Sequence, residues 1–320
     1  MSSIHKHTLY IILVLGIALA PVCHSFGDAR ISVMISQNKE ANNIALASFL
    51  RTVIGNSHRT AIFTYDLGGQ AETGRKVAQE IQSGKPDLVL AIGTTAAMAA
   101  KEELEGIPIV FCMVLNPVSS GLVKSMNSPG GSITGASLDI PLETQFKYMK
   151  SVAGNLKAIG VLYNPEETGA LVQQADRVAR QMNISLLAKP ISSDRDVPNA
   201  LKSLIGGMDA LWSVADTTVF STTQSTQYIL LNTLRTGTPF MGLSSSFVTA
   251  GALMSLSCDY DDVGQQAAEI ADRILKGESA GDMPVAVPRK VSLSLNLKTA
   301  DHIGLRIPDE VIRSADKVIK

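Results

Sequence analysis

The chain has 320 residues, of which 45% are apolar and 18% charged, and its 28 basic and 29 acidic side chains nearly cancel. This length favours two domains or one large one, with enough apolar residues for a substantial core. The near-neutral charge, without a basic block or an acidic tail, argues against a nucleic-acid partner.

The N-terminus has the pattern of a secretory leader. Lys6 precedes an uninterrupted apolar stretch over residues 9–20, which is shorter than the roughly 20 residues of a membrane-spanning helix. Small residues then follow at the positions that signal peptidase reads, so residues 1–25 are predicted to be a signal peptide that is cleaved near Ser25 or Gly27.

Two other interpretations of this segment remain open. The apolar stretch could stay attached as an anchor, and Cys23 could be lipidated. The preceding Pro21-Val22 is a poor lead-in for lipidation, which favours small residues. An exported chain without either attachment is the first prediction.

Export would leave few residues for redox or metal chemistry. After removal of the leader, only Cys112, Cys258, His58 and His302 remain of their types. Both cysteines lie among apolar residues, which predicts buried free thiols, and sequence does not decide whether they pair. A zinc site or a His-based catalytic triad is not expected, and neither is a metal or a cofactor.

Short apolar runs alternate with amphipathic helical patterns along the chain. Runs with little polar alternation are typical of parallel strands covered by helices on both faces. The predicted strands are, in order, Ile31–Ile35, Ala61–Tyr65, Leu88–Ile92, Ile109–Leu115, Ala158–Tyr163, Ser185–Ala188, Ala210–Val214, Phe240–Leu243 and Ala252–Leu256. This pattern predicts an α/β fold of doubly wound parallel sheets.

The chain also repeats itself. The segment from Asp87 to Thr95 aligns without a gap to the segment from Asp209 to Thr217, and the turn Gly106-Ile-Pro108 recurs as Gly237-Thr-Pro239. Because this echo is in order and includes the turn residues, we expect two similar lobes. General likeness among doubly wound proteins is the alternative explanation.

Ligands of open parallel sheets bind beyond the carboxyl ends of the strands. Thr94 and Thr95 follow such a strand and begin a helix, whose free N–H groups and dipole attract a carboxylate. Their hydroxyls would add donors, although one of them could simply cap the helix. We expect both threonines to bind a ligand carboxylate.

The equivalent strand end in the second half carries Asp216, Thr217 and Thr218. An aspartate opposite a threonine pair would suit a zwitterion, with Asp216 receiving the ammonium group. Capping of its own helix is the other role open to Asp216. Further polar residues at predicted strand ends complete the expected binding set: Asn116, Pro117, Asn164, Thr168, Ser244 and Ser245.

Catalytic signatures are missing from the sequence. It has no Gly-x-Gly-x-x-Gly after a strand, no Walker loop and no Gly-x-Ser-x-Gly elbow. Adjacent carboxylates such as Glu166-Glu167 are explained by solvation. Aromatic residues near the strand ends are sparse, with Tyr163 expected in the core and Phe247 as a cover over an apolar part of a ligand.

Several of these segments together resemble a known family, the ABC-transporter substrate-binding proteins that include tryptophan- and phenylalanine-binding members. The resemblance runs from about Ile31 to the C-terminus and rests on Pro86 to Thr94, Ile107 to Phe111, Asn116-Pro117-Val118 with Gly121-Leu122-Val123, Pro129 to Gly135, Ile159 to Pro165, Gly251 to Tyr260, and Ile307-Pro308.

The resemblance implies a type I periplasmic-binding-protein fold, in which the chain crosses between two lobes three times. Crossings near Ser137, Ser257 and Val285 divide it into residues 30–137 with 257–285 as the first lobe, and 138–256 with 286–320 as the second.

This sequence departs from the family pattern at three places. Family members typically have aspartate at Asn116, asparagine at Thr217, and often acidic residues near Ser244. These departures predict a less anionic pocket than is usual in the family.

The function expected from these features is capture of a small solute, an amino acid or a similar carboxylate, by hinge closure. The resemblance implies a monomeric periplasmic receptor that serves an ABC permease in the inner membrane, and not an enzyme. Two alternatives stay open: a ligand sensor for a membrane signalling protein, and an exported α/β hydrolase or transferase. A DNA-binding repressor is disfavoured because a leader stands where a helix-turn-helix would be.

Overall fold

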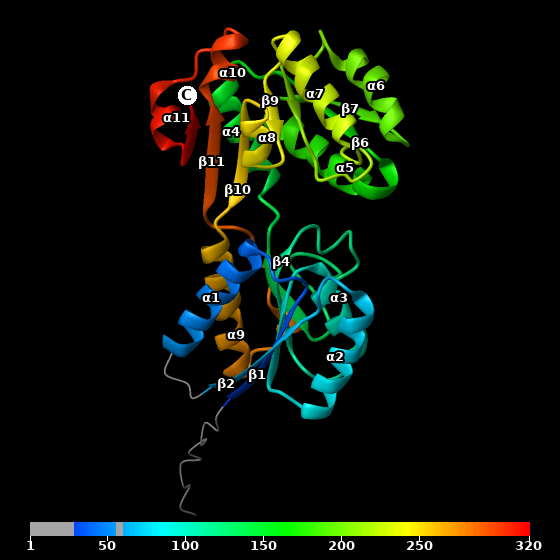
Figure 1. The fold of residues 1–320 in the computed structure, drawn as a ribbon, viewed down its shortest axis with the longest axis vertical. Coiled ribbons are helices and arrows are strands. Elements are labelled where there is room, and N and C mark those ends of the chain that lie inside the picture. Colours follow the sequence, from blue (N-terminus) through cyan, green and yellow to red (C-terminus); the bar gives the residue numbers. More distant parts are fainter. Residues whose placement is uncertain (1–28, 56–59) are drawn as a thin grey trace, which may run out of the picture.

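A computed structural model describes residues 29–55 and 60–320 of the chain. The predicted signal peptide, Cys23 and His58 lie outside these residues. Figure 1 shows two α/β lobes stacked along the long axis and joined at a narrow waist. None of the helices in the described part combines the length and the apolar character that crossing a membrane requires.

In the described residues, the first lobe is built on a five-stranded parallel sheet with the order β2-β1-β3-β4-β5. Its strands are β1 (Ala29–Ile35), β2 (Thr60–Asp66), β3 (Leu88–Ile92), β4 (Ile109–Val114) and β5 (Ile133–Ser137). Its helices are α1 (Glu40–Gly55), α2 (Ala71–Gly84), α3 (Thr94–Glu103), α9 (Tyr260–Leu275) and the short η2 (Ala280–Asp282). Helix α9 comes from late in the chain and packs along α1 (Figure 1).

The second lobe has a seven-stranded sheet with the order β12-β11-β10-β9-β8-β6-β7, again counting the described residues. Its strands are β6 (Ala158–Tyr163), β7 (Ser185–Pro190), β8 (Ala210–Trp212), β9 (Phe240–Gly242), β10 (Met254–Cys258), β11 (Val291–Asn296) and β12 (Lys317–Ile319). Its helices are α4 (Leu142–Ala153), α5 (Pro165–Gln181), η1 (Asp194–Asp196), α6 (Val197–Leu204), α7 (Thr223–Arg235), α8 (Ser245–Thr249), α10 (Leu297–His302) and α11 (Asp309–Ser314). Strand β11 runs antiparallel to β10, so this sheet is parallel except at that pair.

The central strands explain the apolar runs of the sequence. All residues of β3 and β4 are buried, because helices cover both faces of the sheet, and burial of this kind supplies the main favourable free energy of folding. The edge strand β2 is largely exposed instead. The α/β two-lobe prediction is confirmed, and every predicted apolar run overlaps a strand, although β4, β8 and β9 end one or two residues earlier than predicted and β10 begins two residues later.

Strands β5, β11 and β12 were not among the predicted strands. Strand β5 reads Ile-Thr-Gly-Ala-Ser, and its small residues give little apolar signal. They are needed there because a side chain at Gly135 would meet the carbonyl oxygen of Phe111, only 2.0 Å from an added Cβ atom. The close packing of β5 against β4 therefore requires small residues at places where the prediction looked for large apolar ones.

The predicted internal repeat corresponds to a repeat in the fold. Strands β2-β1-β3-β4-β5 and β7-β6-β8-β9-β10 have the same order in space and in sequence. Asp87 accepts a hydrogen bond from Arg30 N at the start of β1, and Asp209 accepts from Lys157 N and Ala158 N at the start of β6. Asp87 and Asp209 are thus equivalent in the two lobes, and each holds the start of the first strand of its lobe.

The chain passes between the lobes after β5, between β10 and α9, and between η2 and β11 (Figure 1). These crossings are bonded to one another. Ser137 N donates to Ala286 O at 2.8 Å, and Asp259 N donates to Lys290 O at 3.3 Å. The Cys258 thiol donates to Leu138 O at 3.2 Å. The waist is therefore a small three-segment hinge.

Candidate ligand-binding site

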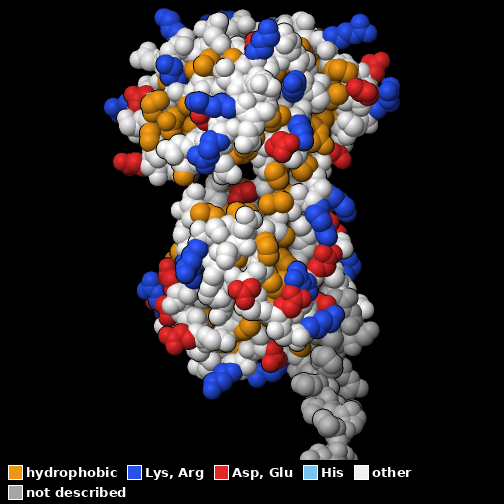
Figure 2. Space-filling model, turned by 180° about the vertical axis from the view of Figure 1, so that it is seen from behind, with side chains coloured by type: hydrophobic (Ala, Val, Ile, Leu, Met, Phe, Trp, Pro, Cys, Tyr) orange, Lys and Arg blue, Asp and Glu red, His pale blue; other side chains and the backbone are white. Residues whose placement is uncertain are grey.

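The carboxyl ends of the strands in the two lobes face each other. Strand β5 ends at the first crossing into the second lobe, and β10 ends at the crossing into the first. Strands parallel to β5 or β10 must end at the same edges as they do. The loops after these strands therefore meet at the waist, where Figure 2 shows the surface narrowed and hollowed between the lobes.

In the first lobe, this edge presents the start of α3. Gly93 has a φ of 88° and turns the chain from β3 directly into the helix. Ser36, at the end of β1, accepts a hydrogen bond from Ala96 N at 2.9 Å and so caps the helix. Thr94 is exposed and Thr95 is half-buried.

The cap by Ser36 leaves both threonines available. Among the described residues, neither the hydroxyl groups nor the backbone N–H groups of Thr94 and Thr95 have a hydrogen-bond partner. A helix start with free donors is a receptor for an anion. This is the arrangement that the carboxylate prediction requires, and it places the capping role on Ser36.

The next loop of the first lobe follows β4 and contains Asn116 in a left-handed conformation, with a φ of 50°. Asn116 N donates to both carboxylate oxygens of Asp139, at 2.9 and 3.1 Å. The Asn116 side chain has no hydrogen-bond partner in the part of the chain that the structure describes. Pro117 is buried and shapes the turn, in which its carbonyl accepts from Val123 N.

In the second lobe, Asp216 is buried, with 2% of its surface exposed. One carboxylate oxygen accepts from Asn164 N at 2.7 Å and from the Thr168 hydroxyl at 2.6 Å. The other accepts from Thr218 N at 3.1 Å and Val219 N at 3.0 Å. Both oxygens of Asp216 thus accept hydrogen bonds that hold the loops after β6 and β8 together. An ammonium group could bind Asp216 only by displacing one of these donors.

The neighbouring polar residues are also bonded to one another. Asn164 caps α5 through Glu166 N, and its amide donates to the Thr218 hydroxyl at 2.9 Å. The Glu167 carboxylate accepts from Thr217 N at 2.6 Å and from the Thr217 hydroxyl at 3.0 Å. This rim is a closed hydrogen-bond network within the second lobe.

Of the three serines after β9, two are hydrogen-bonded to each other and, within the described residues, one has a free hydroxyl. The hydroxyls of Ser244 and Ser246 bond each other at 2.7 Å, whereas the Ser245 hydroxyl has no partner among residues 29–55 and 60–320. Phe247, predicted as a cover, packs edge-to-face on Phe220 and Phe240, with ring centroids 5.4 and 6.4 Å away. Its ring thus belongs to an aromatic cluster of the second lobe.

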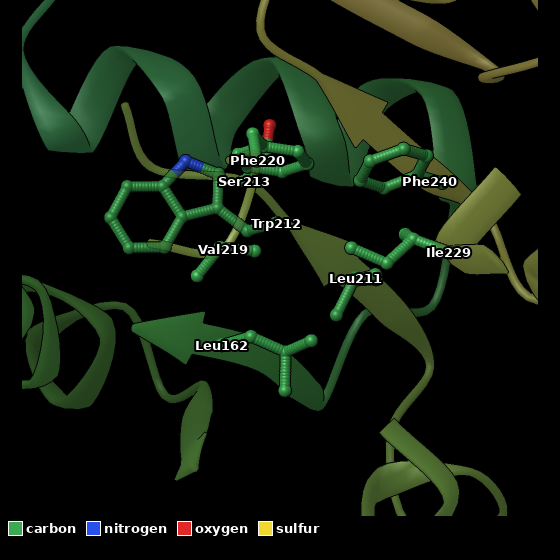
Figure 3. A pocket seen from close by; sticks show the side chains of 8 residues that line it. All are labelled: Leu162, Leu211, Trp212, Ser213, Val219, Phe220, Ile229 and Phe240. Atoms are coloured by element: carbon green, nitrogen blue, oxygen red, sulfur yellow. The ribbon is translucent and has the colours of Figure 1, made fainter. Parts of the chain in front are cut away.

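A separate small pocket lies inside the second lobe (Figure 3). Its lining is mainly the apolar side chains of Leu162, Leu211, Trp212, Val219, Phe220, Ile229 and Phe240. The one polar lining side chain, Ser213, donates its hydroxyl to Met241 O at 2.7 Å. A charged ligand would find no free partner there, so this pocket is a packing feature.

The cysteines and the histidine do not contribute to the site. Cys112 and Cys258 are free thiols, and burial raises the pKa of each to about 12, with Asp139 adding to the shift at Cys258. His302 is exposed at the end of α10. No cluster of metal-ligating side chains occurs in the described part of the chain.

Three residues that the sequence analysis passed over matter at these edges: Ser36, Asp139 and Glu167. Ser36 and Asp139 follow the ends of β1 and β5, so the strand-end rule would have found them had these ends been included. Glu167 was assigned to solvent, but it holds Thr217 in place. Glu167 follows Glu166 in the sequence, and a pair of adjacent carboxylates gave no reason to expect this contact.

Comparisons with known proteins agree with this geometry. The family described as ABC transporter substrate binding protein matches residues 65–319. A tyrosine-binding protein of Clostridioides difficile (strain R20291) is 31% identical over 255 residues, which cover 76% of this chain and 73% of the relative.

Solved structures give the same assignment. The ligand-free, open structure of a substrate-binding protein with adhesive properties from Clostridium difficile is 26% identical, covers 91% of this chain and 99% of its own, and has a TM-score of 0.76. An ABC domain from Streptococcus pneumonia in complex with L-Trp shares the fold at 22% identity, with 92% and 100% coverage and a TM-score of 0.65. Because the family match spans residues 65–319 and the tyrosine-binding relative is 31% identical, the chain belongs to the ABC transporter substrate-binding protein family.

Proposed function

We propose that this protein captures an aromatic amino acid, tyrosine or tryptophan, between its lobes and presents it to an ABC permease in the inner membrane. The family consists of binding proteins, not enzymes. The choice of ligand is supported by the tyrosine-binding relative and by the L-Trp complex of a structural neighbour.

The observation that carries the proposal is the set of unpaired donors at Thr94 and Thr95. Their hydroxyls and N–H groups stand at a helix start that faces the second lobe. A ligand carboxylate would satisfy several of them at once, and exclusion of water on closure would strengthen each bond.

Apolar side chains in the loop after β4, the strand next to β3, suit an aromatic ligand. Leu115 and Val118 flank Asn116 in the loop after β4 and are 45% and 42% exposed, respectively. Exposed large apolar side chains at a cleft favour burial against an apolar partner. The ring of the ligand would supply that partner, and the unpaired Asn116 side chain could add a polar contact.

The remaining features of the proposal concern the context of the protein. We place it in the periplasm as a monomer after cleavage of residues 1–25. The first lobe would comprise residues 30–137 and 257–285, and the second 138–256 and 286–320. The binding set would include the predicted residues whose side chains are free, namely Thr94, Thr95, Asn116 and Ser245, while the others shape the rim.

A thermal-shift screen of the purified protein against the twenty amino acids tests the proposal. Tyrosine or tryptophan should raise the melting temperature, because a ligand at 100 times its Kd stabilises the folded state by about 2.7 kcal/mol. A Thr94→Val/Thr95→Val variant should lose the response, and Thr238→Val, which changes a half-buried threonine before β9 in the second lobe, should keep it.

A well-folded protein that responds to no amino acid would contradict the proposal. Uptake of labelled tyrosine by cells with and without the gene then separates import from signalling, because a sensor for a membrane signalling protein would leave uptake unchanged.

A further inference from the structure

We infer that Asp139, at the first crossing of the hinge, receives the ammonium group of the ligand. The inference rests on the proposed amino-acid ligand and adds a binding residue to that site. It follows from the surroundings of Asp139, from its place relative to Thr94, and from the internal bonding of the other carboxylates at the cleft.

Asp139 is a partly buried carboxylate without a cationic partner. The carboxylate accepts from Asn116 N, shared between its two oxygens, and from the Ser137 hydroxyl. None of the ion pairs formed within residues 29–55 and 60–320 includes Asp139. Acceptor positions therefore remain free, and a partly desolvated anion without a counter-ion favours binding of a cation.

The pKa of Asp139 agrees with this description. Burial raises the pKa of its carboxyl group above the ordinary value, although the bonds from Asn116 and Ser137 act in the opposite direction. The charge of Asp139 acts on the thiol of Cys258, which in turn acts on the phenol of Tyr260, and the pKa values of both groups are raised mainly by burial. Neither group can supply a positive charge.

The other carboxylates considered at the cleft have structural roles. Asp216 accepts four hydrogen bonds within its own lobe. Glu167 is bonded to the loop of Thr217, and Asp259 caps α9 through the backbone N–H groups of its first turn. Among these four, Asp139 is the carboxylate that neither caps a helix nor belongs to the hydrogen-bond network of the second lobe.

Position in the sheet also fits an α-amino acid. Asp139 follows β5 and Thr94 follows β3, with β4 between them, so two strand spacings of about 4.8 Å separate their strands. Hydrogen bonds of about 2.8 Å at each end leave about 4 Å for the ligand. An ammonium and a carboxylate on one carbon atom can fill this gap.

Isothermal titration calorimetry with two pairs of ligands tests the inference. Each pair compares an amino acid with its analogue lacking the amino group: L-tyrosine with 3-(4-hydroxyphenyl)propanoate, and L-tryptophan with indole-3-propanoate. The wild type should prefer the amino acid by about 10- to 100-fold, as expected for one charged hydrogen bond. Asp139→Asn should reduce this preference to nearly one by weakening the amino acid only.

Two control variants separate a binding role from general damage. Asp209→Asn changes a carboxylate that also accepts backbone N–H groups, but at the opposite edge of the second sheet, and should keep the preference. Asp139→Ser also removes the charge while keeping an oxygen for Asn116 N. It takes the place of Asp139→Asn in the experiment if that variant does not fold. It should lose the preference as well.

The thermal stability of the ligand-free protein gives a second readout. Burial raises the pKa of Asp139 in the folded protein above its value in the unfolded protein. The ionised carboxylate therefore lowers the stability of the fold at pH values above the folded-state pKa, and this penalty is absent at pH values below the unfolded-state pKa. At pH 7, Asp139→Asn should therefore raise the melting temperature without ligand while lowering affinity for the amino acid. A merely structural carboxylate would lower the melting temperature on replacement.

The outcomes are distinguishable. If the wild type binds no amino acid, the proposed function fails and the inference fails with it. If the wild type prefers the amino acid and Asp139→Asn keeps that preference, the inference alone is wrong. Loss of the preference in Asp216→Asn instead of Asp139→Asn would assign the ammonium group to Asp216.

Discussion

At the scale of single residues, equivalent strand ends in the two lobes use their polar groups differently. Thr94 leaves its donors free because Ser36 caps α3 in its place. Asp216 occupies the matching position in the second lobe and directs all of its acceptor capacity inward. The start of α3 in the first lobe thus offers free binding groups, whereas the matching strand end of the second lobe forms a rigid rim.

The structural role of Asp216 gives a stability prediction. In Asp216→Asn, an amide NH₂ replaces one of the two carboxylate oxygens. Whichever oxygen is replaced, two donors lose their acceptor: either Asn164 N and the Thr168 hydroxyl, or Thr218 N and Val219 N. The free energy of unfolding should fall by about 2–3 kcal/mol. Urea unfolding monitored by circular dichroism measures this as a lower midpoint with an unchanged m-value.

Asp209→Asn is the matched control for this change. Asp209 also accepts backbone N–H groups, but it is exposed, so water replaces the lost bonds and the loss of stability should be well below that of Asp216→Asn. Equal losses would show that burial does not set the importance of Asp216.

At the scale of elements, the strands of the repeat were predictable from the sequence and the helix starts were not. The Asp87 and Asp209 segments align, and their strands β3 and β8 occupy equivalent places. After β3 the helix begins at once, at Thr94, but after β8 the chain forms a loop and α7 begins only at Thr223. Strand burial leaves a pattern in the sequence, whereas a loop held by Asp216 depends on contacts with residues distant in the chain.

The same distinction applies to the candidate site. Its expected place at the strand ends followed from topology alone, whereas the availability of Thr94 and Thr95 depends on the cap by Ser36, which the sequence analysis did not foresee. The commitment of Asp216 did not, because its partners Asn164 and Thr168 lie about fifty positions earlier. Asp139 was missed because β5 carries too few large apolar residues to be recognised as a strand.

The junction between β3 and α3 gives a prediction at this scale. Gly93 has a positive φ of 88°, and an added Cβ atom would lie 2.7 Å from the Ser36 hydroxyl oxygen. Gly93→Ala should therefore lower the free energy of unfolding by about 1–3 kcal/mol through backbone strain. It should also weaken ligand binding, because Ser36 must move and α3 loses its cap.

Gly84→Ala is the control for this variant. Gly84 lies in the last turn of α2 with an ordinary backbone, and an added Cβ atom would come no closer than 4.0 Å to Arg30. Thermal unfolding should show no loss of stability, since alanine is the better helix former. Unchanged affinity in Gly93→Ala would show that the position of Ser36 is immaterial to the site.

At the scale of the whole molecule, the hinge determines what the lobes can do. The first and third crossings are paired like short strands through Ala136 and Ala286, and Arg289 fastens the third to α9 through Asp262 at 2.9 Å. The crossings thus form one unit that is attached to the first lobe. Closure should then occur as a rotation of the second lobe about the start of β11 and the end of β10, with little change inside either lobe.

This hinge predicts a ligand-dependent change of shape. A ligand that contacts both lobes should shift the population towards a closed form. Small-angle X-ray scattering should show a smaller radius of gyration on addition of the amino acid found in the screen. The Thr94→Val/Thr95→Val variant, which removes the threonine hydroxyls of the first lobe, should keep the larger radius at the same ligand concentration. If the wild type bound its ligand without becoming more compact, the ligand would contact one lobe only, and the closed form could not be the state that a permease recognises.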